Sequence, residues 1–346
     1  MKLRDKLGLA IVLTTALGVF SVADAVVNIQ NVGAGARSMA LGNSFVAVAD
    51  NPDAVFENPA GLGQIEKKQV AYTNVSLFFG GIDGDNLGQH VVSYVQPLGS
   101  KLGLGLGFER IGSDLMSENG AFLSLAFKLS KNIHLGLNGK YLFWSVGVID
   151  VPATADPNDT DPLSNESAGG IGLDLGLLWK SPVEGARVGL LLKNLNEPDV
   201  ASRKNAVGLD SDAGKLPMDL HLGVAYQVDP SSLVSVQWVV RDLTAKSVDV
   251  DTGEVELLDD GTEKALTNSE SSRTTKLVIG GETRLVEGLM LRAGGGKIFE
   301  DDATGDLNAG LGYRWNTNLI FDYSYHIPLD LTETDGAHRF SFGYEF

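Results

Sequence analysis

The sequence predicts an all-β fold: a transmembrane antiparallel β-barrel of about 14 strands with a short N-terminal hatch or plug segment. Three observations lead to this prediction. Segments of about ten residues alternate between apolar and polar positions, the connections between them alternate between short and long, and the chain ends on an aromatic strand. Because successive side chains of a strand point to opposite faces, these patterns together are typical of strands that cross a membrane.

The first 25 residues have the features of a secretory signal peptide. Basic residues lie among the first six, residues 7–20 are largely apolar, and residues 23–25 (ADA) fit an A-x-A cleavage site. The alternative is a membrane anchor helix, but the apolar run is short for a bilayer span. We therefore expect residues 1–25 to be removed during export, so that the mature chain begins at Val26.

The two faces of the predicted strands differ in chemistry. Over 101–111, leucine and phenylalanine occupy one face, whereas glycine and glutamate occupy the other, and the same alternation recurs over 171–180 and 220–228. One face suits hydrocarbon and the other does not, which is the pattern of a wall between lipid and lumen. We therefore predict that the substitution Leu104→Asp impairs assembly of the barrel far more than Gly105→Ser does.

About fourteen segments carry this pattern, an even number as a single-chain bacterial barrel requires. They span approximately 68–79, 88–97, 101–111, 119–129, 132–147, 168–180, 187–195, 217–228, 232–243, 274–285, 288–298, 306–315, 318–327 and 337–346. Short connections, such as 98–100 and 130–131, alternate with longer ones, notably 149–167, 196–216 and 243–273. In a barrel the short turns face the periplasm, whereas a soluble β-sandwich or propeller has no reason to keep that parity. We expect the hatch or plug to occupy 26–67 and the barrel 68–346.

Aromatic residues mark the ends of the predicted strands. The last segment carries Phe340, Phe342, Tyr344 and Phe346 on one face. A terminal aromatic residue resembles the signal read by the outer-membrane insertion machinery, so that machinery and outer-membrane lipid are expected partners. Other aromatics lie where interfacial girdles would need them: Trp144, Trp179, Tyr226, Trp238, Trp315 and Tyr325.

Composition excludes several functions. With 44 acidic and 27 basic side chains the net charge is −17, so the average surface repels nucleic acid. The chain has no cysteine and only five histidines, and neither H-E-x-x-H nor G-x-S-x-G occurs. Residues 33–38 (GAGARS) begin like a dinucleotide fingerprint, but Ser38 stands where the third glycine belongs. We expect no enzyme activity and no cofactor.

Two acidic stretches fall in predicted outer loops. Residues 156–161 (DPNDTD) could hold a hard cation through their carboxylates, but they lack the glycine and distal glutamate of an EF-hand loop. A solvated acidic loop is the simpler interpretation, and no metal site is expected. The many carboxylates of residues 249–270 likewise predict a mobile loop.

The face predicted to line the lumen contains charges of both signs. They are Glu109, Lys128, Lys140, Asp174, Lys193, Glu282, Arg284, Arg292, Arg314, Asp322 and Glu345. Either these residues line a permeation path or grip a plug, or they simply pair across the interior. Lumen glycines would let a peptide approach the wall closely, which favours an occupied interior: Gly136, Gly172, Gly176, Gly223, Gly310 and Gly312.

Residues 33–68 are the candidate occupant of the lumen. The motifs 35–42 (GARSMALG), 45–50 (FVAVAD) and 58–62 (NPAGL) resemble the N-terminal signature of the PorV/PorQ-type outer-membrane proteins and, more distantly, of the FadL-type transporters of long-chain fatty acids. The resemblance is specific over these motifs and rests on architecture beyond them. It implies a hatch in the barrel with an Asn-Pro-Ala turn, and its motif residues are Gly35, Arg37, Ser38, Gly42, Asp50, Asn58, Pro59, Ala60 and Gly61. The chain is shorter than the fatty-acid transporters and its hatch is abbreviated, so their ligand-binding residues are not carried over.

These features predict passive transport of a small hydrophobic compound, fatty-acid-like, through a plugged lumen in the outer membrane. The alternative is a PorV-like, non-conducting partner in a type IX-style secretion system, whose outer loops dock exported proteins. A general porin is a third hypothesis, and the apparent plug argues against it.

Overall fold

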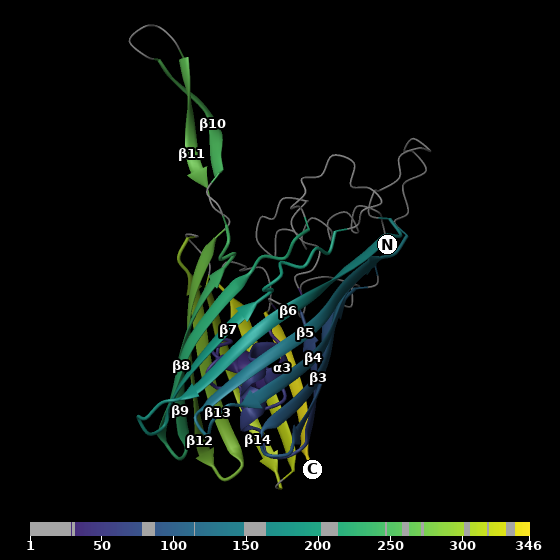
Figure 1. Ribbon diagram of the computed structural model, residues 1–346, viewed down its shortest axis with the longest axis vertical. Coiled ribbons are helices and arrows are strands. Elements are labelled where there is room, and N and C mark those ends of the chain that lie inside the picture. Colours follow the sequence, from purple (N-terminus) through teal and green to yellow (C-terminus); the bar gives the residue numbers. More distant parts are fainter. Residues whose placement is uncertain are drawn as a thin grey trace.

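The computed structural model is a closed antiparallel β-barrel (Figure 1). It describes residues 29, 32–77, 87–113, 115–148, 164–201, 214–245, 248–257, 263–270, 273–300, 305–316, 318–329 and 336–346. The signal-peptide prediction for 1–25 and the acidic run 156–161 lie outside these residues. Around the barrel the strand order is β1-β16-β15-β14-β13-β12-β9-β8-β7-β6-β5-β4-β3-β2, so the first and last strands close the sheet.

Fourteen strands form the barrel, as the sequence predicts. Their bounds are β1 Gln69–Ser76, β2 Gly88–Leu98, β3 Leu102–Gly112, β4 Met116–Lys128, β5 Ile133–Val146, β6 Ser167–Lys180, β7 Ala186–Lys193, β8 Asp219–Asp229, β9 Ser232–Arg241, β12 Thr274–Val286, β13 Leu289–Ile298, β14 Gly305–Trp315, β15 Leu319–Pro328 and β16 Ala337–Glu345. Each strand overlaps a predicted segment. Closure pairs the first and last barrel strands with each other, so neither has a free edge, as a sheet that spans a membrane requires.

The connections divide the barrel into two ends. The end at which β16 finishes carries only short connections, and we call it the short-turn end. The opposite, long-loop end carries the connections from β5 to β6, from β7 to β8 and from β9 to β12. One connection there is short, because β4 begins at Met116, three residues before the predicted start.

The interpretation of residues 249–270 as a mobile loop without regular structure is wrong. Strands β10 (Val248–Leu257) and β11 (Glu263–Glu270) pair as an antiparallel hairpin with an irregularity between Asp251 and Val255. The hairpin is a separate sheet that stands beyond the ends of the barrel strands (Figure 1). The acidic composition concealed its period-two alternation of valine with carboxylate residues.

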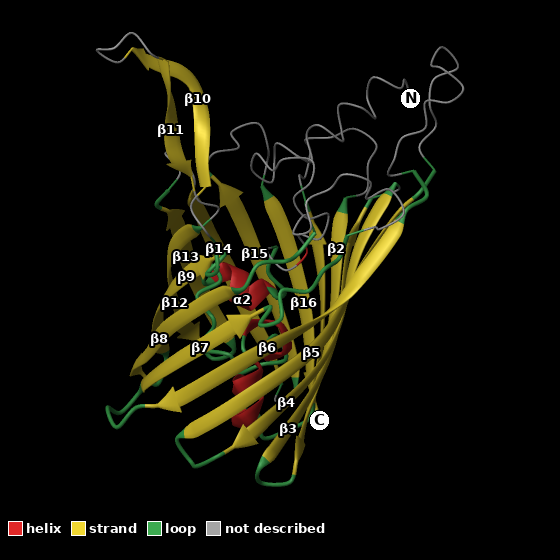
Figure 2. Cartoon of the chain, turned by 45° about the horizontal axis from the view of Figure 1, so that its top comes forward, coloured by secondary structure: helices red, strands yellow, loops and turns green. Residues whose placement is uncertain are grey.

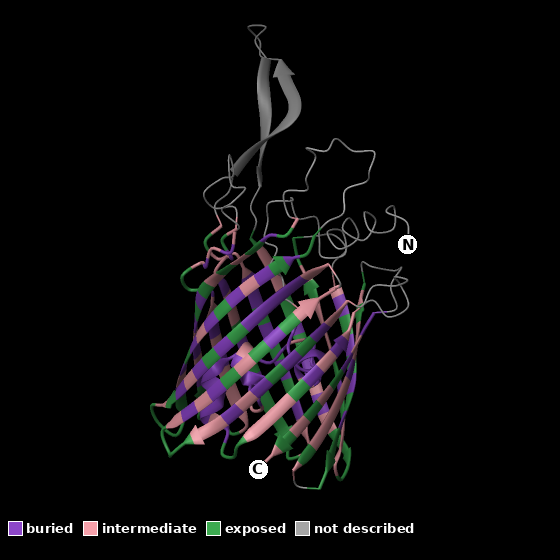
Figure 3. Ribbon diagram, turned by 90° about the vertical axis from the view of Figure 1, so that its right-hand side faces the viewer, coloured by how far each residue is buried: buried purple, intermediate pink, exposed green. Residues whose placement is uncertain are grey.

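The two faces of the wall follow the predicted alternation. Along β5, Leu137 and Tyr141 on the outer face are 47% and 49% exposed, whereas Asn138 and Lys140 on the inner face are 2% exposed. Figure 3 shows these buried and exposed positions as alternating bands along the strands. Trp144 is an exception to the girdle prediction, because it faces inward, is 2% exposed and donates its indole N–H to the Val200 carbonyl at 2.8 Å. Its inward parity decides its position, not its aromatic character.

The N-terminal residues that the structure describes lie inside the barrel (Figure 2). They contain the short helix α2 (Ala36–Ala40), the helical turn α3 (Ala54–Glu57) and the 3-10 helix η2 (Pro59–Gln64). We call residues 32–65 the inner segment. Its apolar side chains, including Leu41, Phe45 and Val55, are fully buried and form the centre of the core.

Candidate functional site

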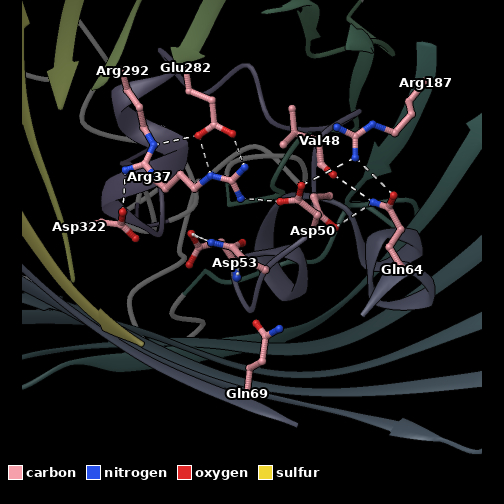
Figure 4. Close-up of polar contacts among 12 residues, drawn as sticks. Arg37, Val48, Asp50, Asp53, Gln64, Gln69, Arg187, Glu282, Arg292 and Asp322 are labelled. Carbon is pink, nitrogen blue, oxygen red and sulfur yellow. Dashed lines mark hydrogen bonds and ion pairs between the residues drawn. The ribbon is translucent and has the colours of Figure 1, made fainter. Parts of the chain in front are cut away.

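Arg37 of the inner segment lies at the centre of a buried ion-pair network (Figure 4). Its guanidinium donates to Glu282 Oε1 at 2.6 Å and Oε2 at 3.0 Å, and to Asp50 Oδ1 at 2.5 Å. Arg292 binds the same Glu282 at 2.9 Å and also Asp322 at 2.6 Å. Two guanidinium groups and three carboxylates thus form one network. Arg37 also lies 5.4 Å from the centre of the Phe45 ring, within cation–π distance.

Asp50 extends this network to β7, three strands from β12 around the barrel. Its second oxygen lies 3.7 Å from Arg187 Nη1 on β7. The same Arg187 nitrogen lies 3.4 Å from Gln64 Oε1, and Gln64 donates to the Val48 carbonyl at 3.0 Å. The inner segment is therefore bound to both β7 and β12 through charged side chains (Figure 4).

Asn58 forms a polar bend against the wall, at the Asn-Pro-Ala motif. Its amide nitrogen donates to the Val46 carbonyl at 2.7 Å and to the Leu177 carbonyl of β6 at 3.2 Å, and its Oδ1 accepts from Ala60 N at 3.1 Å. Asn58 is fully buried, so this side chain satisfies backbone groups that water cannot reach. Pro59 begins η2, where its missing N–H is harmless.

Four other motif residues fix the turns of the inner segment. Ser38 Oγ accepts from Gly35 N at 3.2 Å, and a Cβ at Gly35 would collide with the Asp53 carboxylate. Gly42 has φ +68°, and a Cβ there would lie 2.7 Å from Gly295 N on β13. A Cβ at Gly61 would collide with the Ala49 carbonyl. These residues permit close approach, not chemistry.

Wall glycines receive the inner segment, as the sequence suggested for an occupied interior. A Cβ at Gly136 or Gly176 would collide with the Asn58–Ala60 bend, and one at Gly223 or Gly310 would lie 2.5 Å from a side-chain carbon of Val46 or Ala40. Two predicted positions serve other groups: Gly172 faces Lys140 and Pro198, and Gly312 faces the Arg292–Asp322 pair.

Further wall residues bind the segment backbone, and the sequence reasoning did not select them. Gln237 Oε1 accepts from Phe45 N at 3.0 Å and from Val46 N at 2.9 Å. Ser341 Oγ accepts from Ala36 N at 2.9 Å, and Arg339 donates to the Val32 carbonyl. The only sequence signal was a polar residue at a lumen-facing position.

The remaining predicted lumen charges form a second group and a rim. Lys140 and Asp174 pair at 2.6 Å on β5 and β6, and Asp174 also accepts from Asn138. Glu109 on β3 is buried, whereas Lys128 and Lys193 are half-buried at strand ends. The structure places Arg284 and Arg314, both exposed, at the short-turn end, and Glu345 there binds Lys67 at 2.7 Å.

Two carboxyl groups of the inner segment are strongly affected by burial. Burial raises the pKa of Asp53 to about 6, against an opposing hydrogen bond from Asn51. Burial likewise raises the pKa of Glu57 to about 7, partly opposed by the positive charge of Lys193. Both groups therefore carry protons more readily than exposed carboxyl groups do.

The wall has a notch beside the upper part of β6. Pairing of β6 with β7 runs only from Lys180↔Arg187 to Leu175↔Leu192, so residues 167–174 lack a β7 partner (Figure 2). Asn194 and Glu197 adopt positive φ, and the chain turns inward so that Pro198 lies against Gly172.

One side chain bridges this notch. Asn196 Oδ1 accepts from Leu173 N at 2.9 Å, and its amide nitrogen donates to the Ile171 carbonyl at 2.8 Å. Leu195 N donates to the Leu173 carbonyl at 2.8 Å. Ile171 and Leu173, 68% and 48% exposed, form an apolar rim. A break in the sheet is thus closed by a few hydrogen bonds.

The model of the type IX secretion system membrane protein family PorP/SprF matches residues 54–344. The chain belongs to this family. No curated protein matches the sequence of this PorP/SprF protein. The match begins at α3 and includes the whole barrel, together with the Asn58–Ala60 bend.

Solved structures with a similar fold include two toluene transporters and a FadL homologue. The toluene transporter TbuX of Ralstonia pickettii is 16% identical, with a TM-score of 0.63, over 92% of this chain and 98% of that one. The toluene transporter TodX of P. putida is 13% identical, with a TM-score of 0.63, over 92% and 99%. A FadL homologue of Pseudomonas aeruginosa is 17% identical, with a TM-score of 0.54, over 90% and 98%.

These identities establish a shared barrel fold for the PorP/SprF chain. Its family and its structural neighbours are membrane components and transporters, not enzymes. With its apolar outer wall, the closed barrel is an outer-membrane protein. Among the described residues, no helix has the length and apolar character needed to cross a membrane.

Proposed function

We propose that this protein gives a small hydrophobic, fatty-acid-like compound a passive route across the outer membrane. The observation that carries the proposal is the notch beside β6, where an apolar rim replaces a continuous strand pair. The inner segment, acting as a hatch, blocks a straight path towards the short-turn end. A hydrophobic compound would instead enter from the long-loop end and leave sideways into lipid.

Apolar side chains form part of the inner wall beside this route, next to the Lys140–Asp174 pair. Three apolar side chains on β4 and β5 face the barrel interior and are at most 6% exposed: Phe122, Leu142 and Trp144. They contact the buried core formed with Val200, which lies on the inward-turned chain after β7. The names of the neighbours TbuX and TodX, both toluene transporters, support this class of compound.

Flux into liposomes tests the proposal. The refolded protein is compared with empty vesicles for uptake of a labelled long-chain fatty acid and of a small sugar, and spontaneous flip-flop is subtracted. We expect protein-dependent uptake of the fatty acid alone. Asn196→Ala, which removes the bridge across the notch, should raise that uptake, whereas sugar uptake by the unaltered protein would identify a porin.

Deletion of residues 33–62 tests the occluding role of the inner segment separately. In planar bilayers the deletion should raise ion conductance, because the segment fills the lumen. An unchanged conductance with a folded barrel would contradict the hatch.

A second function is favoured by the family match over residues 54–344. In that function the protein resembles the PorV/PorQ type and serves as a non-conducting component of type IX secretion. The ion pairs that bind Arg37 to the wall support a lumen that stays closed, and the hairpin β10–β11 at the long-loop end is accessible to exported proteins.

Deleting the gene in its own cell and quantifying exported proteins in the medium by mass spectrometry tests this role. Loss of a defined set of exported proteins, together with no flux in liposomes, would favour secretion over transport.

Two further proposals concern biogenesis. Residues 1–25 act as a cleaved signal peptide, and N-terminal sequencing of the mature protein should begin at Val26. The terminal Phe346, 62% exposed, is available to the insertion machinery. Phe346→Ala should lower the amount of folded barrel in the outer membrane, whereas refolding of the same variant from denaturant should be unaffected.

A further inference from the structure

The outer face of the barrel carries one row of polar side chains. In the pairing of β1 to β4, Asn74 lies opposite His90, His90 opposite Arg110, and Arg110 opposite Asn119. The alternation along each strand places these residues on the outer face, as it does lipid-facing residues such as Phe108, which is 41% exposed. The row is near the long-loop end, since Arg110 lies two residues from the end of β3.

The side chains of this row bind one another and leave donors available. His90 Nδ1 lies 2.9 Å from the Tyr72 hydroxyl and 3.3 Å from Asn74 Nδ2, and the Tyr72 and His90 rings stack with centres 6.2 Å apart. Arg110 Nη1 donates to Asn119 Oδ1 at 3.2 Å. A guanidinium has five N–H donors, and among the residues that the structure describes this is the one hydrogen bond that the exposed Arg110 side chain forms.

Most of the outer wall differs from this row, although His338 on β16, the strand beside β1, also faces outward and lies 2.8 Å from the Tyr323 hydroxyl. On other strands the outward residues near the long-loop end include Ile171, Leu307 and Ile327, which are exposed and apolar. Within the described barrel strands, the outward basic residues are Arg110 and the exposed Lys297 on β13. Lys297 lies between Gly296 and Ile298 and has no comparable polar neighbours on its own strand. The polar row is therefore confined to one side of the barrel.

An exposed arginine in one row with an amide and an aromatic ring matches a particular chemistry. Arginine hydrogen-bonds and neutralises phosphate oxygens, amides bind hydroxyl groups, and the face of a tyrosine ring packs against the apolar face of a sugar. A charged group on the lipid face is tolerated only near the membrane interface, where headgroups lie. We propose that Asn74, His90 and Arg110, with Tyr72, form a binding site for a phosphorylated glycolipid headgroup of the outer leaflet, and that the buried Asn119 positions Arg110.

In this site Arg110 pairs with the phosphate, Asn74 binds a sugar hydroxyl, and Tyr72 packs against the sugar ring. Asn119, which is 3% exposed, holds Arg110 through the hydrogen bond at 3.2 Å. The acyl chains of the glycolipid then lie against apolar residues of β3 that are farther from the long-loop end, such as Leu104 and Leu106. The site lies on the outside of the barrel, so its existence does not depend on what passes through the lumen.

Native mass spectrometry of the full-length protein with purified lipid A tests the proposal. The unaltered protein should retain lipid A, and R110Q should weaken retention about tenfold, the change expected for loss of one charge-assisted contact. K297Q is the matched control, since it removes the other outward basic residue, and it should change retention little. R110K keeps the charge and should restore part of the affinity, which separates binding from misfolding.

Two more arms identify the ligand chemistry. Dephosphorylated lipid A should bind about as weakly to the unaltered protein as lipid A binds to R110Q. Inorganic phosphate should fail to displace lipid A, because the headgroup sugars and the lipid chains also contribute. Equal losses in R110Q and K297Q, undiminished binding of dephosphorylated lipid A, or full displacement by inorganic phosphate would each overturn the glycolipid site.

Discussion

Replacing Arg37 tests whether the inner segment is held by its ion pairs. Arg37 is the shared partner of Asp50 and Glu282, and its side chain is 16% exposed. Removing one member of a buried ion pair costs about 3–5 kcal/mol, because the remaining charge loses its partner. Here Glu282 keeps Arg292 at 2.9 Å and Asp50 keeps Arg187 at 3.7 Å, so we expect the lower value, about 3 kcal/mol, for R37Q.

A loss of about 3 kcal/mol raises the fraction of displaced inner segment about 150-fold. Hydrogen exchange measured by mass spectrometry in proteoliposomes reports that fraction, through the amides of α2 compared with those of β5. We expect faster exchange in the inner segment of R37Q and unchanged exchange in the barrel wall.

The double variant R37Q/E282Q provides the matched control. Because Arg37 and Glu282 share one contact, the double variant should exchange more slowly than the sum of the two single-variant effects predicts. Unchanged exchange in R37Q would refute the claim that these ion pairs hold the segment. A double variant as fast as the sum of both single variants would show that Arg37 and Glu282 do not act together.

Three further predictions concern the wall and the pH. Gly136→Ala should lower the yield of folded barrel, because a Cβ would collide with η2. Gly139→Ala on the same strand should be neutral, because no atom lies within 4 Å of the added Cβ. The shift in electrophoretic mobility on heating measures the folded fraction of both variants. Leu104→Asp should destabilise the barrel by about 2 kcal/mol or more on the lipid face, as urea unfolding would show, and Gly139→Ala is again the control. Because burial raises the pKa of Glu57 from 4.5 to about 7, the docked segment holds a proton that the displaced one releases. Docking should therefore weaken as the pH rises from 4.5 through 7, and Glu57→Gln should reduce this dependence in hydrogen exchange.

The strands and their two faces were predictable because a membrane wall imposes a strict period of two. The alternation of leucine with glycine along β3 places Leu104 towards lipid and Gly105 towards the interior without any knowledge of neighbouring strands. However, Gly105 is not a neutral position, since a Cβ would lie 2.7 Å from Val55 Cγ2. Only the structure shows which lumen glycines receive the inner segment.

The partners within the lumen could not be predicted. The sequence identified Glu282, Arg292 and Asp322 as lumen-facing charges, but Arg37 and Glu282 are separated by 245 residues, and their contact depends on the register of the whole sheet. Gln237 was not predicted for the same reason, because the sequence does not show which residue a polar, lumen-facing side chain contacts. The prediction for Trp144 was wrong for a different reason. It relied on the aromatic residue type, whereas the alternation of side chains along β5 points Trp144 inward.

Closure between β1 and β16 places both ends of the barrel sequence beside the inner segment. That segment precedes β1 in the chain, yet its amide at Ala36 is bound by Ser341 on β16. The Ser341 hydroxyl also lies 2.7 Å from the Thr73 hydroxyl on β1, so one side chain joins the inner segment, the first barrel strand and the last. The seam of the barrel and its contents therefore share a contact, and a change that loosens one also weakens the other.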